Sequence, residues 1–211
     1  MVFGQASRFT SVGADINLTP NAVRALDGIG LGDTLRETAA QPRFRICRMW
    51  DMGEETSRLG MAEEAEARHG APQLTPHCAE LKSALEAALP MHTVRLGHRA
   101  TAILPDEHGV ILHFMRSDSE SVDALIGADG VHSIARTSLF GLERPRFTGV
   151  VAFRAVVPSA RLHGVPNLDR FTKLWGASPG SQIVAFPLNR GRDIFIFVTT
   201  AQKSWRHKSW T

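Results

Sequence analysis

The chain has 211 residues, which is enough to bury a hydrophobic core and predicts one domain or two small ones. Hydrophobic residues make up 43% of the chain and charged residues 21%, a balance typical of folded globular proteins and unlike that of disordered ones. The net charge of +3 is spread along the chain. It therefore indicates no nucleic-acid partner, although it suits an anionic cofactor or substrate.

Two further features predict where the protein works. Cys47 and Cys78 form no CxxC pair and no disulfide framework, which favours a reducing compartment. No apolar run reaches the length of a transmembrane helix, and the first residues lack the charged and apolar regions of a signal peptide. We therefore expect a cytoplasmic protein with no membrane partner.

The first forty residues predict two short helices. Thr19-Pro20 combines a preferred N-cap with proline at the first helical position, and a glycine follows at the expected helix end. A second helix is expected over residues 31–39. Between them, residues 28–33 (GIGLGD) are similar to a dinucleotide-binding loop, but Asp33 stands where that motif needs glycine. Because the segment also follows a helix rather than a strand, we interpret it as a helix-helix turn.

The next part of the chain predicts a hairpin and then a longer helix. Residues 43–50 have the alternation of a strand, and a turn at 51–54 leads into a second strand over 56–59. The charged residues 62–68 favour no single structure. Thr75-Pro76 repeats the Thr-Pro pattern and predicts a helix start. That helix is expected to bury one apolar stripe, formed by Leu81, Leu85, Ala88 and Leu89.

A strand, a glycine-rich turn and a helix follow a predicted β-meander. Residues 94–104 and 110–114 are expected to be strands of the meander, 122–126 a short strand, 127–130 a tight turn and 131–140 a helix. Such a turn lets the backbone approach a phosphate, and the helix N-terminus offers free N–H groups and a positive dipole end. The alternative is an ordinary β-turn-α connection.

The last part predicts an antiparallel sheet. Strands are expected over residues 149–157, 170–175, 182–187 and 193–200, with prolines and glycines in the turns between them. The basic and Trp-containing end, residues 203–211, could stack on nucleic acid or simply form a packed or frayed terminus. Its shortness favours a terminus, so we expect no nucleic-acid partner.

Residues 127–136, GADGVHSIAR, resemble the "DG" motif of FAD-dependent aromatic hydroxylases, the family that includes salicylate hydroxylase. In that family the motif contacts the pyrophosphate and ribityl parts of FAD and helps NAD(P)H to engage. Further similar segments occur in the family's order along the chain, at residues 12–26, 67–72, 77–89, 145–154, 184–188 and 208–211.

The resemblance implies a fold, two cofactors and a substrate class. The fold is α/β (α+β), with an incomplete Rossmann-like FAD-binding domain formed by residues 1–42 and 75–145. The remaining residues, 43–74 and 146–211, would form a truncated antiparallel β-sheet substrate domain. The cofactors are FAD and NAD(P)H, and the substrate is a small aromatic molecule that receives one oxygen atom of O₂. The protein positions the cofactor and excludes water.

The same resemblance assigns cofactor-binding residues. Asp129 and Gly130 would contact FAD, and Gly13, Ala14 and Asp15 would lie beside the flavin ring. A carboxylate is a poor phosphate ligand but a good acceptor for a ribityl hydroxyl.

Two arginines are further site candidates, each with an alternative. Arg136 would support the Asp129 turn or contact the nicotinamide cofactor, or else be a solvated helix residue. Arg154 is unusual because it stands between Phe153 and Ala155 in a predicted strand. Its place in the family makes it the candidate catalytic residue, able to pair with a substrate carboxylate. An outward-facing strand arginine is the alternative.

The chain also departs from the family pattern. Neither the family's opening strand–GxGxxG–helix unit nor its closing Gly-Asp motif occurs in these residues. Gly4 stands where the family usually has a ribose-binding glutamate, and Cys78 where it has a cofactor-contacting arginine. We therefore expect an internal part of a hydroxylase whose own activity is impaired. The alternative hypothesis is a non-catalytic remnant or interaction protein that binds no flavin.

Overall fold

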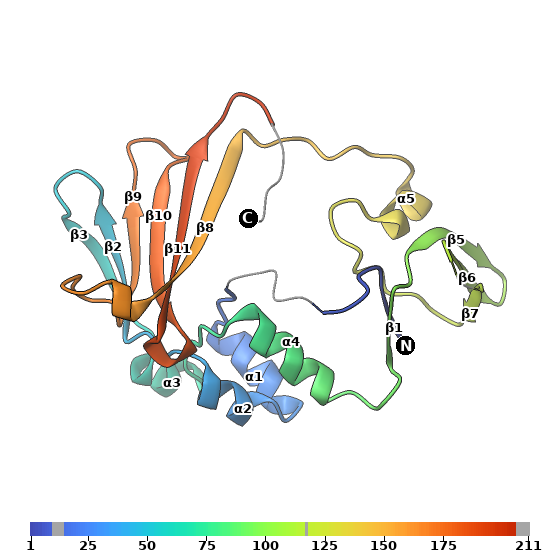
Figure 1. Cartoon of the computed structure of the whole chain (residues 1–211), viewed down its shortest axis with the longest axis horizontal. Helices are drawn as coiled ribbons and strands as arrows, with labels where there is room; N and C mark the ends of the chain where they lie inside the picture. The colour runs from blue at the N-terminus through green and yellow to red at the C-terminus, as the bar shows by residue number, and fades with distance from the viewer. Residues whose placement is uncertain (10–14, 117, 206–211) are drawn as a thin grey trace. The chain divides into compact units, whose positions relative to one another are not determined.

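The computed structural model describes residues 1–9, 15–116 and 118–205, which fall into two compact units (Figure 1). One unit comprises residues 1–10 and 89–148, and the other comprises residues 11–88 and 149–211. Both units contain α-helices and β-strands, which confirms the predicted α/β class. The predicted division into cofactor and substrate domains concerns function and stays a prediction.

The first unit holds two small sheets. Strand β1 (Val2–Gly4) runs parallel to β4 (Val94–Leu96). The antiparallel sheet comprises β5 (Ala100–Asp106), β6 (Gly109–Phe114) and β7 (Glu120–Val122). The single strand predicted over residues 94–104 is therefore wrong, because Gly97 has a positive φ of 75° and separates β4 from β5.

An aromatic cluster packs between these two sheets. The rings of Phe3 and Phe114 lie 5.0 Å apart, and His98 contacts both of them at 5.8 and 5.3 Å. Buried aromatic side chains give a large apolar area for few residues, so this cluster can serve as the core of a small unit.

The strand–turn–helix stretch differs in extent from its prediction. Strand β7 ends at Val122, which pairs with Val110 at the start of β6, so the chain beyond it has no strand to pair with. The predicted strand over residues 122–126 is therefore wrong past its first residue. Helix α5 (Ile134–Phe140) begins three residues later than predicted and is joined to β5 by a Ser138 Oγ–Ile103 carbonyl hydrogen bond of 3.1 Å.

The second unit is built on one large sheet with the order β3-β2-β9-β10-β11-β8. Its strands are β2 (Phe44–Met49), β3 (Glu55–Gly60), β8 (Val150–Pro158), β9 (Phe171–Trp175), β10 (Gln182–Leu188) and β11 (Asp193–Ala201). Neighbours are antiparallel except for β2 and β9, which are parallel. The predicted antiparallel sheet of β8, β9, β10 and β11 is confirmed. The predicted β2–β3 hairpin extends this sheet beyond β9 and forms one of its edges.

Helices pack at one end of this sheet (Figure 1). They are α1 (Pro20–Gly28), α2 (Gly32–Thr38), α3 (Glu63–His69) and α4 (Cys78–Ala87). The predicted helix-helix turn between α1 and α2 is confirmed, and Arg36 of α2 pairs with Asp27 of α1 at 2.5 Å. Among the residues that the structure describes, every helix is too short or too polar to cross a membrane.

The helix start predicted at Thr75-Pro76 is wrong. Thr75 is completely buried, and its hydroxyl lies 2.7 Å from the Pro187 carbonyl and 3.2 Å from the Ala40 carbonyl. Helix α4 begins instead at Cys78, where the imidazole Nδ1 of His77 accepts the Ala79 amide at 3.1 Å. The hydroxyl of Thr75 thus ties the connector before α4 to the end of β10.

The buried stripe of α4 also differs from the prediction. Leu81 and Ala84 are 8% and 9% exposed and join the core that α1 and α2 share, whereas Leu85 and Leu89 are about two-fifths exposed. The spacing identified the helix correctly, but two adjacent apolar stripes were available and the sequence did not distinguish them.

Candidate functional site

The carboxylate of Asp129 caps helix α5. Its Oδ2 accepts the backbone amides of Ile134 and Ala135 at 2.7 and 3.2 Å, and its Oδ1 accepts the Ser133 hydroxyl. Ser133 Oγ in turn accepts the Arg136 amide at 2.9 Å. Because a helix leaves its first amides unpaired, two side chains here satisfy them from just upstream.

This cap corrects the mechanism inferred for the turn. The α5 amides that were expected to face a phosphate donate to Asp129 and Ser133 instead. Partial loss of hydration acts to raise the pKa of the exposed Asp129 carboxyl, but the hydrogen bonds from Ser133, Ala135 and Ile134 outweigh this effect and hold the pKa below its usual range. Asp129 therefore stays ionised at neutral pH, with lone pairs left to accept a hydroxyl.

The other predicted residues of this turn have defined local roles. Gly127 is needed for close packing, because a Cβ on it would lie 2.5 Å from the Ala135 Cβ. Gly130 takes a positive φ of 83° and faces open space. Arg136 donates from its guanidinium to the Val131 carbonyl at 3.2 Å, so it supports the turn. Contact of Asp129, Gly130 and Arg136 with a cofactor stays a prediction.

In the second unit, paired segments bring Asp15 opposite His77. Leu18 and Leu74 form an antiparallel bridge, and the Ile16 amide donates to the Pro76 carbonyl at 3.3 Å. Extending that register by one residue places Asp15 against His77, at the N-terminal end of α4.

Electrostatics connects Asp15 with Arg154. Burial raises the pKa of the Asp15 carboxyl, and the positive charge of Arg154, a local backbone hydrogen bond and His77 act in the opposite direction without cancelling it. The raised pKa identifies a carboxyl group held partly out of water, a setting typical of functional sites. Arg154 is thus close enough to Asp15 for its charge to act on the carboxyl group.

Arg154 lies in a row of side chains that crosses the large sheet. The strand register aligns Arg154 of β8 with Phe197 of β11, Val184 of β10 and Lys173 of β9. Directly paired residues lie on the same face of a sheet, so Arg154 and Lys173 stand on either side of the two apolar residues. The backbones of β8 and β9, which carry the two cations, are about 14 Å apart across the sheet. The Arg154 guanidinium lies 5.8 Å from the Phe197 ring centroid, and the Lys173 ammonium lies 3.7 Å from the Trp175 ring centroid.

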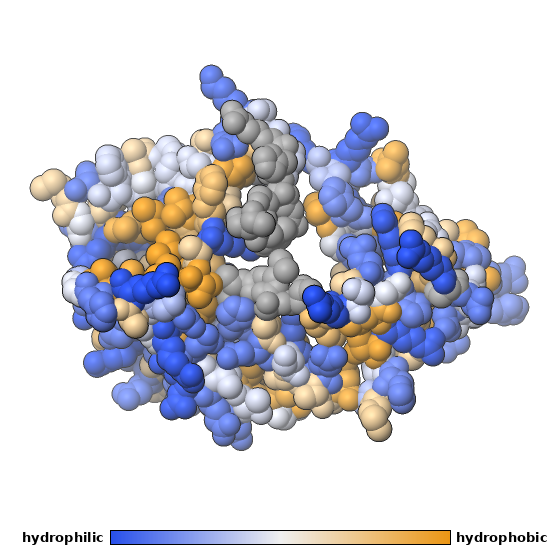
Figure 2. Space-filling model, in the orientation of Figure 1, coloured by the Kyte–Doolittle hydropathy of each residue, from blue (hydrophilic) through white to orange (hydrophobic). Residues whose placement is uncertain are grey.

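The face of the sheet that carries this row holds further aromatic rings. Phe186 stacks on Phe171 at 4.7 Å and contacts Phe195 at 5.0 Å. Figure 2 shows hydrophobic residues gathered over the strands of this sheet. These three rings are buried in the core of the unit, whereas Arg154 is exposed and Phe197 is half-buried. Arg154 and Phe197 therefore form the part of the row that has the chemistry to hold a planar aromatic anion.

Not every predicted residue can be placed. Gly13 and Ala14 lie outside the described residues. Asp129, Gly130 and Arg136 belong to the first unit, whereas Asp15 and Arg154 belong to the second.

Sequence reasoning missed three residues of the second unit: His77, Lys173 and Phe197. Lys173 lies in a strand predicted over 170–175, and its alternation with Phe171 and Trp175 was the available signal. The positions of His77 and Phe197 depend on which segments pair, which the sequence alone does not state.

Comparison with known proteins gives the family. The family model described as "FAD binding domain" matches residues 11–210. The chain is 32% identical to the 6-hydroxynicotinate 3-monooxygenase of Bordetella bronchiseptica, over 99% of the chain and 55% of that protein. It is 34% identical to the 3-amino-4-hydroxybenzoate 2-monooxygenase of Streptomyces cremeus, over 92% and 48%, and 31% identical to a salicylate hydroxylase of Pseudomonas putida, over 99% and 50%.

Solved structures show the same fold. Klebsiella pneumoniae HpxO complexed with FAD and uric acid matches with a TM-score of 0.79 at 24% identity, over 98% of the chain and 51% of that structure. The tetrameric form of 2-methyl-3-hydroxypyridine-5-carboxylic acid oxygenase matches with a TM-score of 0.75 at 22% identity, over 94% and 51%. The chain spans about half the length of the curated relatives it matches. By its family match over residues 11–210 and these relatives, the chain belongs to the FAD-dependent aromatic hydroxylases.

Proposed function

We propose that this chain forms part of an NAD(P)H-using flavin monooxygenase that hydroxylates a small aromatic acid. The observation that carries the proposal is the position of Arg154, whose guanidinium lies 5.8 Å from the Phe197 ring centroid and whose charge acts on the half-buried carboxyl of Asp15. The relatives support it, because their names specify hydroxynicotinate, aminohydroxybenzoate and salicylate chemistry. Each of those names refers to an aromatic ring that carries a carboxylate.

The residues present fit an FAD cofactor in chemical type. Asp129 is an ionised acceptor at an exposed turn, which suits the hydroxyl groups of a ribityl chain. Asp15 is a half-buried carboxyl next to the segment predicted to pass the flavin ring. When bound, FAD would supply the redox and oxygen chemistry that amino-acid side chains lack.

The chain's own residues would bind and orient the substrate. The guanidinium of Arg154 would hold the substrate carboxylate by two parallel hydrogen bonds, and the ring of Phe197 would support the aromatic plane. The Asp15 carboxylate would accept a proton from a ring hydroxyl, because its raised pKa makes it a better base than an ordinary aspartate. Burial around Asp15 limits access of water.

The test compares an aromatic acid with its neutral amide. Salicylate should bind the chain more tightly than salicylamide, and Arg154→Met should weaken salicylate binding roughly 10- to 100-fold while leaving salicylamide binding nearly unchanged. The matched control is Arg161→Met, at an exposed site in the short 3₁₀ turn after β8. If Arg154→Met weakened the binding of both ligands equally, or left salicylate affinity unchanged, Arg154 would not be part of the substrate site.

A further inference from the structure

Lys173 carries a positive charge that no described residue neutralises. Within the part of the chain that the structure describes, its side chain takes part in no hydrogen bond and no ion pair. The ammonium nitrogen lies instead 3.7 Å from the ring centroid of Trp175. Lys173 is half-buried and Trp175 is exposed, so the pair borders solvent. An ammonium group has three N–H donors, and an aromatic ring face leaves them available to an oxygen atom.

The strand register places Gln182 next to this pair. Gln182 of β10 pairs directly with Trp175 of β9, and Val184 pairs with Lys173. Residues two apart in a strand lie on the same face, so Lys173, Trp175 and Gln182 share one face of the sheet. Gln182 is half-buried, and its side-chain amide makes no hydrogen bond to any residue that the structure describes. This amide therefore has both a donor and an acceptor to offer a ligand.

Arg154 stands on the same face, on the other side of Phe197 and Val184. Its guanidinium lies 5.8 Å from the Phe197 ring centroid, beside the neighbouring strand β11. The charge of Arg154 acts on the carboxyl of Asp15, so this carboxyl belongs to the Arg154 side of the row. The two sides of the row thus differ in chemistry, with a guanidinium and a carboxyl on one and an ammonium and an amide on the other.

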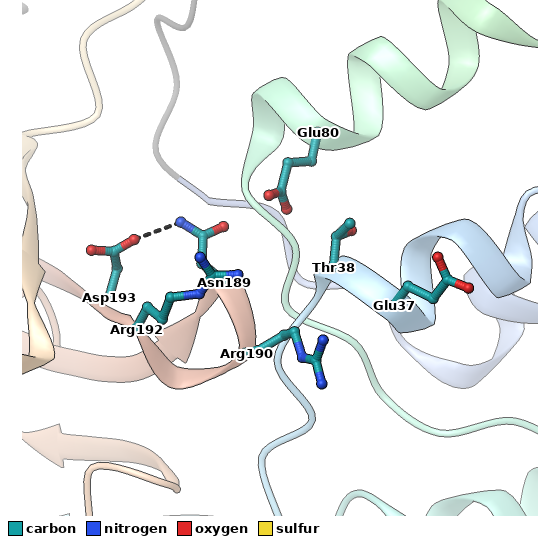
Figure 3. A pocket seen from close by; sticks show the side chains of 7 residues that line it. All are labelled: Glu37, Thr38, Glu80, Asn189, Arg190, Arg192 and Asp193. Carbon is teal, nitrogen blue, oxygen red and sulfur yellow. Dashed lines mark hydrogen bonds between the residues drawn. The ribbon is translucent and has the colours of Figure 1, made fainter.

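A polar cavity of about 210 Å³ lies at the opposite end of β10 and β11, at the turn that joins them (Figure 3). Its lining comprises Glu37, Thr38, Glu80, Asn189, Arg190, Arg192 and Asp193. Figure 3 shows the Arg190 guanidinium directed away from Glu80 and Asn189, so these side chains do not converge on one ligand. The polar groups at the Lys173 end of β9 and β10 are therefore the better candidates for ligand recognition.

We propose that Lys173 is a specificity-determining residue that binds a ring hydroxyl of the substrate, on the side of the ring away from its carboxylate. The inference rests on the proposed function, in which Arg154 holds that carboxylate. The Lys173 ammonium donates a hydrogen bond to the hydroxyl oxygen, and the Gln182 amide oxygen accepts the hydroxyl proton.

The chemistry of this pair and its place on the sheet select the substrate class. A hydroxyl group both donates and accepts, so it suits an ammonium beside an amide better than a second carboxylate, which only accepts. The backbones of β8 and β9 are about 14 Å apart, and the long side chains of Arg154 and Lys173 shorten this span from both sides. A hydroxyl para to the carboxylate points from Arg154 toward Lys173. The favoured substrate is therefore an aromatic acid with a para hydroxyl group.

The test is calorimetric titration of the full 211-residue chain with 4-hydroxybenzoate, benzoate and salicylate. The wild-type chain should bind 4-hydroxybenzoate about tenfold more tightly than benzoate, because only the former reaches Lys173 with a hydroxyl group. Lys173→Met should abolish this preference by weakening 4-hydroxybenzoate binding about tenfold. Its affinity for benzoate, and for salicylate, whose hydroxyl lies beside the carboxylate, should change by less than about twofold. Gln182→Leu should weaken 4-hydroxybenzoate binding by a smaller factor.

Matched variants separate this inference from the proposed function. Lys203→Met removes an exposed lysine beyond β11 and should change none of the three affinities. Arg154→Met should weaken all three acids. If it does so while Lys173→Met leaves the preference for 4-hydroxybenzoate intact or weakens benzoate equally, only the role of Lys173 is wrong. The same holds if the wild-type chain shows no preference. If no acid binds, or Arg154→Met leaves every affinity unchanged, the proposed function fails and this inference fails with it.

Discussion

At the scale of single residues, Asp129 shows how a motif residue can have a structural task that its sequence context only suggests. The Asp-Gly pair predicted a turn correctly. It did not reveal that the carboxylate caps α5, because capping depends on where the helix begins, three residues later than its periodicity indicated. Ser133, the second capping side chain, was visible in the sequence as a preferred N-cap type directly before the helix.

The Asp129 cap predicts a pH-dependent loss of stability. Asp129→Ala should lower the free energy of unfolding by about 1 kcal/mol at pH 7, and Asp129→Asn by less, since an amide oxygen still accepts a hydrogen bond. Solvent screening limits the contribution of the charge because the residue is exposed.

The sign of this pH dependence follows from the lowered pKa of Asp129. A carboxylate with a lowered folded-state pKa stabilises the fold above its unfolded pKa, and this contribution disappears as the pH falls through the folded value. Urea unfolding at neutral and acidic pH should therefore show the wild-type and Asp129→Asn proteins converging in acid. A difference that grows in acid would contradict the cap.

Asp15 gives the opposite prediction. Its folded-state pKa is raised by burial, so ionising it costs folding free energy as the pH rises through and beyond the unfolded pKa. Asp15→Asn should therefore leave stability at neutral pH unchanged or increased.

The positive charge of Arg154 lowers the pKa of Asp15 and so acts against the effect of burial. Arg154→Gln should therefore raise the pKa of Asp15 further. A ¹³C NMR titration of the Asp15 carboxyl measures this, with Arg161→Gln as the control that should not move it. An Asp15 pKa that falls or stays constant in Arg154→Gln would show that the two groups do not interact.

At the scale of elements, most helices and strands of the second unit could be predicted because their signals are local. Helix α1 has its Thr-Pro start, and the strands from β8 to β11 have turn residues between them. The failures share a cause in long-range pairing. Strand β7 ends where its antiparallel partner β6 begins. Thr75 does not begin a helix, because its hydroxyl is hydrogen-bonded to the carbonyl groups of Ala40 and Pro187. These partners are distant in the sequence, so the local sequence around each element does not indicate them.

Thr75 therefore has a testable role between elements. Thr75→Val keeps the shape of the side chain but leaves buried carbonyl groups without their hydroxyl partner, so it should cost about 1–3 kcal/mol of unfolding free energy. Thr56→Val, on the exposed strand β3, is the matched control and should change stability by less than about 0.5 kcal/mol. Equal effects of the two substitutions, measured by urea unfolding, would show that the buried hydroxyl contributes nothing special.

At the scale of the whole molecule, the family could be predicted from several segments in order, and the family model and relatives confirm it. The arrangement of the site could be predicted only in part. Asp15 and Arg154 are far apart in sequence, and the sequence did not indicate that the charge of Arg154 acts on the Asp15 carboxyl in the second unit. The Arg154–Phe197–Val184–Lys173 row depends on strand register, which becomes visible only in the folded sheet.

The central claim is that this chain contributes to an FAD site, and titration of the purified 211-residue chain with FAD tests it most directly. We predict saturable binding of one FAD per chain. The free energy of unfolding should rise by about 2.7 kcal/mol once free FAD reaches about one hundred times its dissociation constant, and the melting temperature should rise with it. FAD should also co-elute with the protein in gel filtration. A colourless protein whose melting temperature does not change over the whole range of added FAD would contradict the proposal.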